Sequence, residues 1–264
     1  MNAVEQFYDQ NVISEWERCL RHPTEFAITR KAFAEYLPKP PARVLDIGGG
    51  PGRYAIELAQ QGYQVTLADL SSSALNFAAE KAREAGVSLE GLLHVNALDL
   101  SHLPAASWDI VLLMGPLYHL LEADARRQAV LQARARLKPG GLLCASFITR
   151  YAPFRDAAHQ NIEWVTADPA YSHRLLTTGI HDNGDGFTNA YFAHPAEIEP
   201  LFQETGFQTI QILGVEGFVA NNEQHVNLLT GTDWDLLIEL NYITAKDPAM
   251  RACSDHLLYI GRLP

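Results

Sequence analysis

The stretch Val44-Leu45-Asp46-Ile47-Gly48-Gly49-Gly50-Pro51-Gly52-Arg53-Tyr54 decides the fold of this 264-residue chain. Apolar residues lead into an acid, four glycines follow within positions 48–52, and a helical pattern comes next. Glycine tolerates the positive φ angles and the close ligand approach that a tight turn requires. The pattern therefore predicts a strand, a turn and a helix N-terminus, with a ligand bound at the turn.

Strand and helix patterns alternate downstream of this turn. We expect helices over 52–61, 71–85 and 123–137, and strands over 43–47, 64–69, 89–95, 108–114 and 142–149. The strand at 108–114 is almost wholly apolar, as a strand covered on both faces should be. Repeated strand–helix units predict an α/β fold with a doubly wound, mostly parallel sheet and right-handed crossovers.

Two segments outside this alternation complete the expected organisation. Residues 1–41 predict an N-terminal helical cap of two helices that break near Pro23, followed by a core over 42–149. Residues 150–194 are rich in aromatic residues and histidine, and an insertion of this length predicts a lid or binding segment. Residues 195–264 resume with a helix over 195–205 and strands over 207–215 and 256–261, with a mostly helical stretch at 221–250.

Composition narrows the class of protein. The net charge of −11 argues against nucleic-acid partners and anionic membranes, because phosphate binding needs a basic surface. Cys19, Cys144 and Cys253 form no Cys-x-x-Cys pair, and the histidines form no metal-binding pair, so we expect neither disulfides nor a bound metal. With no signal sequence and no apolar run near the roughly 20 residues of a membrane span, we expect a cytoplasmic protein.

The residues around the glycines discriminate between nucleotide ligands. A GxxxxGK[ST] phosphate loop is absent, and Arg53 stands where a dinucleotide fingerprint needs glycine or alanine. Asp46 would repel a pyrophosphate but suits a cationic group, such as the amino group of a methionine moiety. Asp69, at the end of the second strand, can accept from both ribose hydroxyls, and Leu70 can lie against an adenine face.

The chain resembles the class I S-adenosylmethionine-dependent methyltransferases. The resemblance rests on the glycine turn with Asp46, on Asp69-Leu70-Ser71, on the segments 96–100 and 109–115, and on Lys138-Pro139-Gly140-Gly141. It implies a Rossmann-like sheet of seven strands with the last one antiparallel, S-adenosylmethionine as cofactor and S-adenosylhomocysteine as product. The implied cofactor-binding residues are Asp46, Gly48, Gly49, Gly50, Gly52, Asp69, Leu70, Asn96, Ala97, Leu98, Met114 and Gly115. Asn96 stands where the family often has aspartate.

The acceptor side is expected around Gly115-Pro116-Leu117-Tyr118-His119-Leu120, because ligands of open α/β sheets bind beyond the carboxyl ends of the strands. His119 is our candidate general base, since imidazole titrates near working pH, with Tyr118 orienting the acceptor. A purely structural His119 is the other interpretation. The predicted acceptor-binding residues are Tyr8, Trp16, Tyr118, His119, Arg150 and Tyr151.

The motif after the fourth strand also bears on the kind of acceptor. It lacks the Asn/Asp-Pro-Pro-Tyr/Phe sequence found in relatives that act on nucleic acid or protein. We therefore expect O- or N-methylation of a small molecule by a monomer or homodimer. Two alternatives stay open: a non-catalytic S-adenosylmethionine-binding or partner-binding module, and a nicotinamide-dependent oxidoreductase, which Asp46 and Arg53 disfavour.

Overall fold

The computed structural model describes residues 3–182 and 187–264, and its centre is a seven-stranded sheet of order β3-β2-β1-β4-β5-β9-β8. Strands β1 to β5 pair in parallel, and β9 runs antiparallel to both β5 and β8. This topology confirms the predicted fold class. The strands are β1 (Arg43–Ile47), β2 (Gln64–Asp69), β3 (Gly91–His94), β4 (Trp108–Leu113), β5 (Leu137–Ile148), β8 (Gln208–Gly214) and β9 (His256–Arg262).

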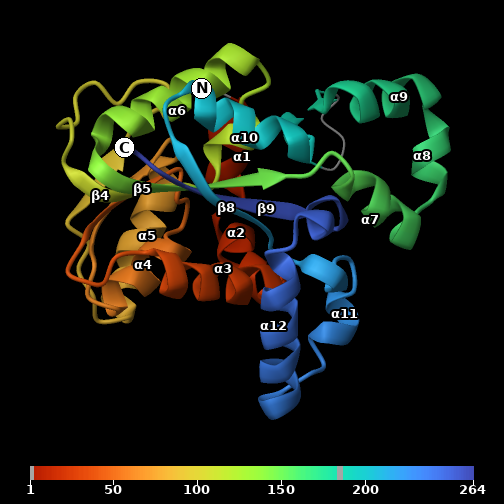
Figure 1. The fold of residues 1–264 in the computed structure, drawn as a ribbon, viewed down its shortest axis with the longest axis horizontal. Coiled ribbons are helices and arrows are strands. Elements are labelled where there is room, and N and C mark those ends of the chain that lie inside the picture. The colour runs from red at the N-terminus through yellow and green to blue at the C-terminus, as the bar shows by residue number, and fades with distance from the viewer. Residues whose placement is uncertain (1–2, 183–186) are drawn as a thin grey trace.

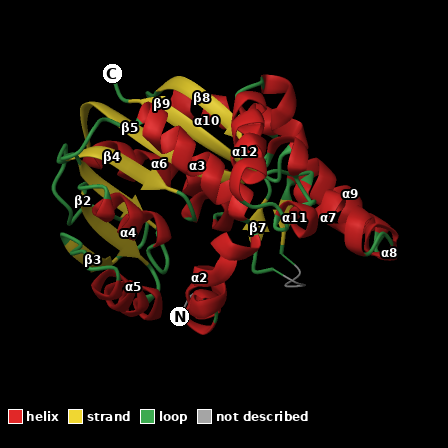
Figure 2. Ribbon diagram, turned by 90° about the horizontal axis from the view of Figure 1, so that it is seen from below, coloured by secondary structure: helices red, strands yellow, loops and turns green. Residues whose placement is uncertain are grey.

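Helices cover both faces of the sheet (Figures 1 and 2). One face packs on α6 (Ala123–Arg136) and α10 (Pro195–Glu204), and the other on α3 (Pro23–Tyr36), α4 (Arg53–Gln60), α5 (Ser72–Glu84) and α12 (Gly231–Ala245). Successive side chains of a strand point to opposite faces, so Leu45 joins the first core while Val44 joins the second. The apolar residues of the strands are therefore buried on both faces of the sheet.

The N-terminal cap contains three helices where two were expected: α1 (Ala3–Gln10), α2 (Val12–Arg21) and α3. The additional break falls at Asn11, whose side-chain amide donates to the backbone oxygen of Phe7 at 2.8 Å. Asparagine that bonds to nearby backbone in this way competes with helix continuation. The predicted break near Pro23 is present, with Pro23 in the first turn of α3.

The insertion after β5 folds into α7 (Ala152–Gln160), α8 (Glu163–Ala167), α9 (Pro169–Thr178) and a hairpin of β6 (Ile180–His181) and β7 (Ala190–Tyr191). It extends beyond the carboxyl end of β5 (Figure 1) and has its own small core around Tyr171, Leu175, Ala190 and Phe192. Part of the predicted insertion, residues 183–186, lies outside the described residues, as do residues 1–2 of the cap.

The last part of the chain returns to the sheet. Between β8 and β9 lie α11 (Glu223–Val226), α12 and two short 3₁₀ helices, Gly217–Val219 and Pro248–Cys253. Strand β5 begins earlier than expected, because Leu137 already pairs with Trp108 before the Lys-Pro-Gly-Gly segment. Among the described residues, no helix combines the length and the apolar character that crossing a bilayer requires.

The contact between Phe202 and Tyr259 offers a test of how α10 holds the sheet. Phe202 is fully buried, and its ring stacks on Tyr259 of β9 with centroids 3.7 Å apart. We expect Phe202→Ala to lower the free energy of unfolding by about 3–5 kcal/mol in urea titrations, because it leaves a cavity in a close-packed core. The control Phe218→Ala, at a ring that is 47% exposed, should change it by about 0.5 kcal/mol or less. Equal effects of the two substitutions would contradict the assigned packing.

Candidate functional site

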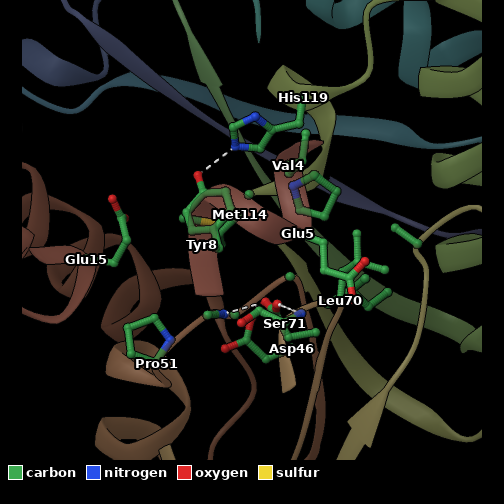
Figure 3. Close-up of a pocket in the computed structure, with 18 of the residues that line it drawn as sticks. Val4, Glu5, Tyr8, Glu15, Asp46, Pro51, Leu70, Ser71, Met114 and His119 are labelled. Carbon is green, nitrogen blue, oxygen red and sulfur yellow. Dashed lines mark hydrogen bonds between the residues drawn. The ribbon is translucent and has the colours of Figure 1, made fainter. Parts of the chain in front are cut away.

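A cavity lies at the carboxyl ends of β1, β2 and β4, where the crevice rule for open α/β sheets places ligands. Its floor comes from residues 46–51, 69–71, 95–98 and 114–116, and residues 118–120 form part of its wall. The cap closes it from the other side with side chains of α1 and α2, namely Val4, Glu5, Tyr8, Glu15, Arg18 and Cys19. We call it the donor cavity; Figure 3 shows 18 of its lining residues.

The glycine turn has the backbone that its sequence predicts. Gly48, Gly50 and Gly52 have φ angles of +68°, +54° and +83°. A Cβ at Gly48 would come within 2.5 Å of the Pro116 ring, whereas Gly50 has nothing within 4 Å and leaves open space. Gly52 is a correction to the predicted cofactor residues, because it does not line the cavity. It precedes α4, and a Cβ there would meet Ala78 of α5 at 3.1 Å.

Asp69 holds the turn in place. Its Oδ2 accepts from the backbone N–H of Gly50 at 2.7 Å, and its Oδ1 accepts from the N–H of Ser71 at 2.8 Å. Burial raises the pKa of Asp69 above its ordinary value, and these backbone donors oppose that shift. A carboxylate has about four acceptor positions, so Asp69 retains capacity for the two hydroxyls of a ribose.

Asp46 lies beneath the turn with no partner for its charge. It is 1% exposed, and neither carboxylate oxygen has a hydrogen-bond partner among the described residues. Burial, with a smaller contribution from the charge of Asp69, raises the pKa of Asp46 to about 7. A buried, unpaired carboxylate is costly unless a ligand satisfies it. The amino group of a methionine moiety has the charge and the donors for that role.

The predicted adenine-side residues Leu70, Asn96, Ala97 and Leu98 all line the donor cavity, as do Met114 and Gly115 at the end of β4. The Asn96 side-chain oxygen accepts from the N–H of Leu98 at 2.9 Å, which fixes the loop after β3. The Leu70 backbone oxygen bonds to His94 at 2.7 Å. In each contact a side chain bonds to a nearby backbone group, and the two hydrogen bonds hold the loops at this end of the cavity in place.

Three rings lie together where the acceptor is expected, Tyr8, Tyr118 and His119, and all of them line the cavity. His119 Nδ1 lies 3.4 Å from the backbone oxygen of Asn189, and Tyr8 Oη lies 2.6 Å from His119 Nε2. A carbonyl only accepts, so Nδ1 carries the proton and Nε2 accepts from the Tyr8 hydroxyl (Figure 3). Burial lowers the pKa of His119 to about 4, so the imidazole is neutral near pH 7. Burial also raises the pKa of Tyr118 to about 12.

Three residues predicted to bind the acceptor lie away from the cavity. Trp16 packs under the Arg53 guanidinium, 3.7 Å from its ring centroid. Arg150 is buried in an ion pair with Glu197 at 2.9 Å, and the Tyr151 ring packs on His194. The structure therefore corrects the predictions for Trp16, Arg150 and Tyr151, because partners elsewhere in the fold hold all three.

The sequence patterns do not single out several lining residues, among them Val4, Glu5, Glu15 and Cys19. Their spacing carries a signal. Val4 and Tyr8 are one helical turn apart, as are Glu15 and Cys19, so each pair lies on one face of its helix. That face is turned toward the cavity. Asp9, next to Tyr8, anchors α1 by accepting from the Ser71 hydroxyl at 2.6 Å.

Arg18 centres a charged cluster at the edge of the cavity. Its Nη2 lies 2.6 Å from Glu25 and 3.0 Å from His256 Nε2, and His256 Nδ1 lies 2.6 Å from Glu216. Burial alone would raise the pKa of Glu216, but His256 lowers it to about 2. In the described part of the chain, Glu25, Glu216 and His256 are close enough to share a metal ion, but the Arg18 guanidinium already provides their cation.

Comparisons with known proteins agree with this geometry. Residues 44–141 match a family described as methyltransferase domain. A ubiquinone biosynthesis O-methyltransferase of Thiobacillus denitrificans is 32% identical over 174 residues, 66% of this chain and 67% of that protein. The chain belongs to the class I S-adenosylmethionine-dependent methyltransferases, and S-adenosylmethionine is its cofactor. The oxidoreductase and the non-catalytic module are therefore set aside.

Two further proteins are similar to this chain, one in sequence and one in fold. A tRNA 5-carboxymethoxyuridine methyltransferase of Escherichia coli is 28% identical over 219 residues, 81% of this chain and 78% of that protein. The magnesium protoporphyrin IX methyltransferase of Synechocystis, solved with bound S-adenosylhomocysteine, shares the fold. It is 14% identical, with a TM-score of 0.58 and coverage of 99% of this chain and 98% of that one.

The assignment of Asp69 to the ribose predicts a loss of affinity. We expect Asp69→Ala to weaken S-adenosylhomocysteine binding about 100-fold in calorimetric titration, because two hydrogen bonds to a charged acceptor are lost. Circular dichroism should show that the fold survives. The control Asp235→Ala, at an exposed acid of α12, should bind as the wild type does. Unchanged affinity of Asp69→Ala would refute the ribose assignment.

The unpaired Asp46 predicts a stability effect that depends on pH. Its pKa is raised from 3.8 to about 7, so between these values the native state binds more protons than the unfolded state. Wild-type stability therefore declines as pH rises through this window. Asp46→Asn removes that decline, so we expect the variant to gain stability relative to wild type between pH 5 and pH 8 in urea titrations. Asp235→Asn should show no such trend, and a pH-independent difference for Asp46→Asn would contradict the assignment.

Proposed function

We propose that this enzyme transfers the methyl group of S-adenosylmethionine to an oxygen or nitrogen atom of a small-molecule acceptor. The observation that carries the proposal is the hydrogen bond between Tyr8 and His119 in the wall of the donor cavity. Through this bond the Tyr8 hydroxyl holds the neutral His119 imidazole in the wall formed by the loop after β4.

Methyl transfer requires the protein mainly to align the donor with the acceptor, to exclude water and to remove a proton from the acceptor. When bound, S-adenosylmethionine supplies a methyl group on a positively charged sulfur. An acceptor O–H or N–H that bonds to the Tyr8 oxygen completes a path on which the Tyr8 proton passes to His119 Nε2 and the acceptor proton replaces it. The electron pair of the broken S–CH₃ bond stays on sulfur, and His119 ends as imidazolium.

Enclosure and charge support a small acceptor. The cap places Val4 and Tyr8 of α1 and Arg18 of α2 over the cavity, which restricts the space above the donor. The net charge of −11 repels polyanions. The similarity to a ubiquinone biosynthesis O-methyltransferase supports O-methylation of a small molecule.

A second candidate acceptor is a carboxymethoxyuridine in tRNA. The similarity to the E. coli enzyme favours it, because that match spans 81% of this chain. Arg18 and Arg53 are cationic residues that line the cavity, although the Arg18 guanidinium is already bonded to Glu25 and His256. A transfer assay that includes tRNA alongside small molecules distinguishes the two acceptors.

The assignment of His119 predicts a separation of turnover from binding. We expect His119→Ala to lower turnover about 100-fold, in the range typical of a lost general base, while the donor dissociation constant changes less than about threefold. Transfer of a radiolabelled methyl group to a panel of phenols, amines and total tRNA measures the first, and calorimetry measures the second.

Two variants complete the test. Tyr8→Phe removes the hydroxyl that bonds to His119 and should also reduce turnover. His173→Ala, at an exposed histidine of α9, should leave both quantities unchanged. If His119→Ala turns over as the wild type does, His119 is structural. If only tRNA is labelled, the small-molecule proposal fails.

A further inference from the structure

A second carboxylate in the donor cavity lacks a partner, besides Asp46. Glu15 of α2 is half-buried and lines the cavity, and its side chain makes no ion pair or hydrogen bond with any described residue. Figure 3 shows it on the wall that the cap contributes, apart from Asp46 at the base. The same cavity therefore holds two unpaired acids at different places.

The absence of a partner for Glu15 is notable because Arg18 lies three residues further along the same helix. Acids and bases at this spacing commonly pair. The Arg18 guanidinium instead bonds to Glu25 with both Nη atoms, at 3.2 and 2.6 Å, and to His256 at 3.0 Å. Burial raises the pKa of Glu15, with Arg18 opposing the shift. Arg18 is thus committed elsewhere, and the Glu15 carboxylate is left for a ligand.

The electrostatic neighbours of Glu15 locate it within the cavity. Burial is the main cause of the raised pKa values of Tyr8 and Tyr118, and the charge of Glu15 adds to both. Its carboxylate therefore acts on the rings of the acceptor side. Tyr8, Tyr118 and Glu15 all line the donor cavity. Glu15 therefore lies on the cap wall of this cavity, near enough to the two rings for its charge to act on them.

The charges of the donor match this arrangement. S-adenosylmethionine carries an ammonium, a sulfonium and a carboxylate, whereas S-adenosylhomocysteine has an uncharged thioether in place of the sulfonium. Asp46 at the base suits the ammonium, which leaves the second acid for the second cation. We propose that Glu15 supplies the negative charge that lets the enzyme bind the methylsulfonium donor in preference to its thioether product.

This electrostatic effect of Glu15 applies while the ligand is bound, and it changes when the methyl group leaves the sulfur. Before transfer, the Glu15 carboxylate faces a positive sulfur and stabilises the bound donor. After transfer the sulfur is neutral, and the same half-buried carboxylate again lacks a counter-charge, which favours release of the product. The inference concerns this chain's binding of its cofactor, and it stands whichever acceptor is methylated.

The experiment compares three ligands on the purified full-length chain without acceptor: S-adenosylmethionine, S-adenosylhomocysteine and sinefungin, in which a carbon bearing an ammonium replaces the methylsulfonium. Calorimetric titration of Glu15→Gln should show about tenfold weaker binding of the two charged ligands and less than twofold change for S-adenosylhomocysteine. Glu15→Asp keeps the charge and should keep the preference for the charged ligands.

Glu17→Gln is the matched control, since Glu17 lies on the same helix and is exposed. It should bind all three ligands as the wild type does, and thermal melts should show that every variant is folded. Equal weakening of all three ligands by Glu15→Gln, or no weakening of any, would overturn the proposal. A wild-type chain that binds none of the three would instead refute the assignment of the donor cavity itself.

Discussion

The bond from the Gly50 N–H to the Asp69 carboxylate is the constraint on which the site depends. It ties the turn after β1 to the end of β2, two strands that already pair in register from Arg43 to Ile47. The positive φ angles at Gly48 and Gly50 let the backbone bend into this contact, and Gly50 has open space where a side chain would lie. One carboxylate therefore holds the backbone against which we expect the donor to bind.

The N-terminal cap forms the other side of the cavity and contributes charged side chains to it. Arg18 is engaged by Glu25 and by His256, which Glu216 orients, so segments far apart in the chain meet beside the cavity. Two of the acids that line the cavity, Asp46 and Glu15, make no side-chain hydrogen bond or ion pair with any described residue. A site that pairs Arg18 beside the cavity and leaves these two carboxylates without partners is suited to a cationic ligand.

The sequence predicts the fold, and it places the expected donor-binding residues at strand ends whose order follows from local patterns. Asp46, Asp69, Leu70 and Asn96 all reach the cavity. The acceptor half depends on long-range packing, which no local pattern encodes. Arg150 follows β5 as predicted, yet its guanidinium pairs with Glu197, 47 residues further along the chain. Glu15 reaches the cavity only because α2 packs against α1, α3 and α5.

The packing of α1 over the cavity bears on the rate at which ligands exchange. This helix lines the donor cavity through Val4 and Tyr8, and two hydrogen bonds hold it, from Tyr8 to His119 and from Ser71 to Asp9. We expect exchange of product for fresh donor to open these two bonds, so that α1 moves away from the cavity and back. On this expectation each catalytic cycle includes an opening step, whose rate competes with that of the chemical step in setting turnover.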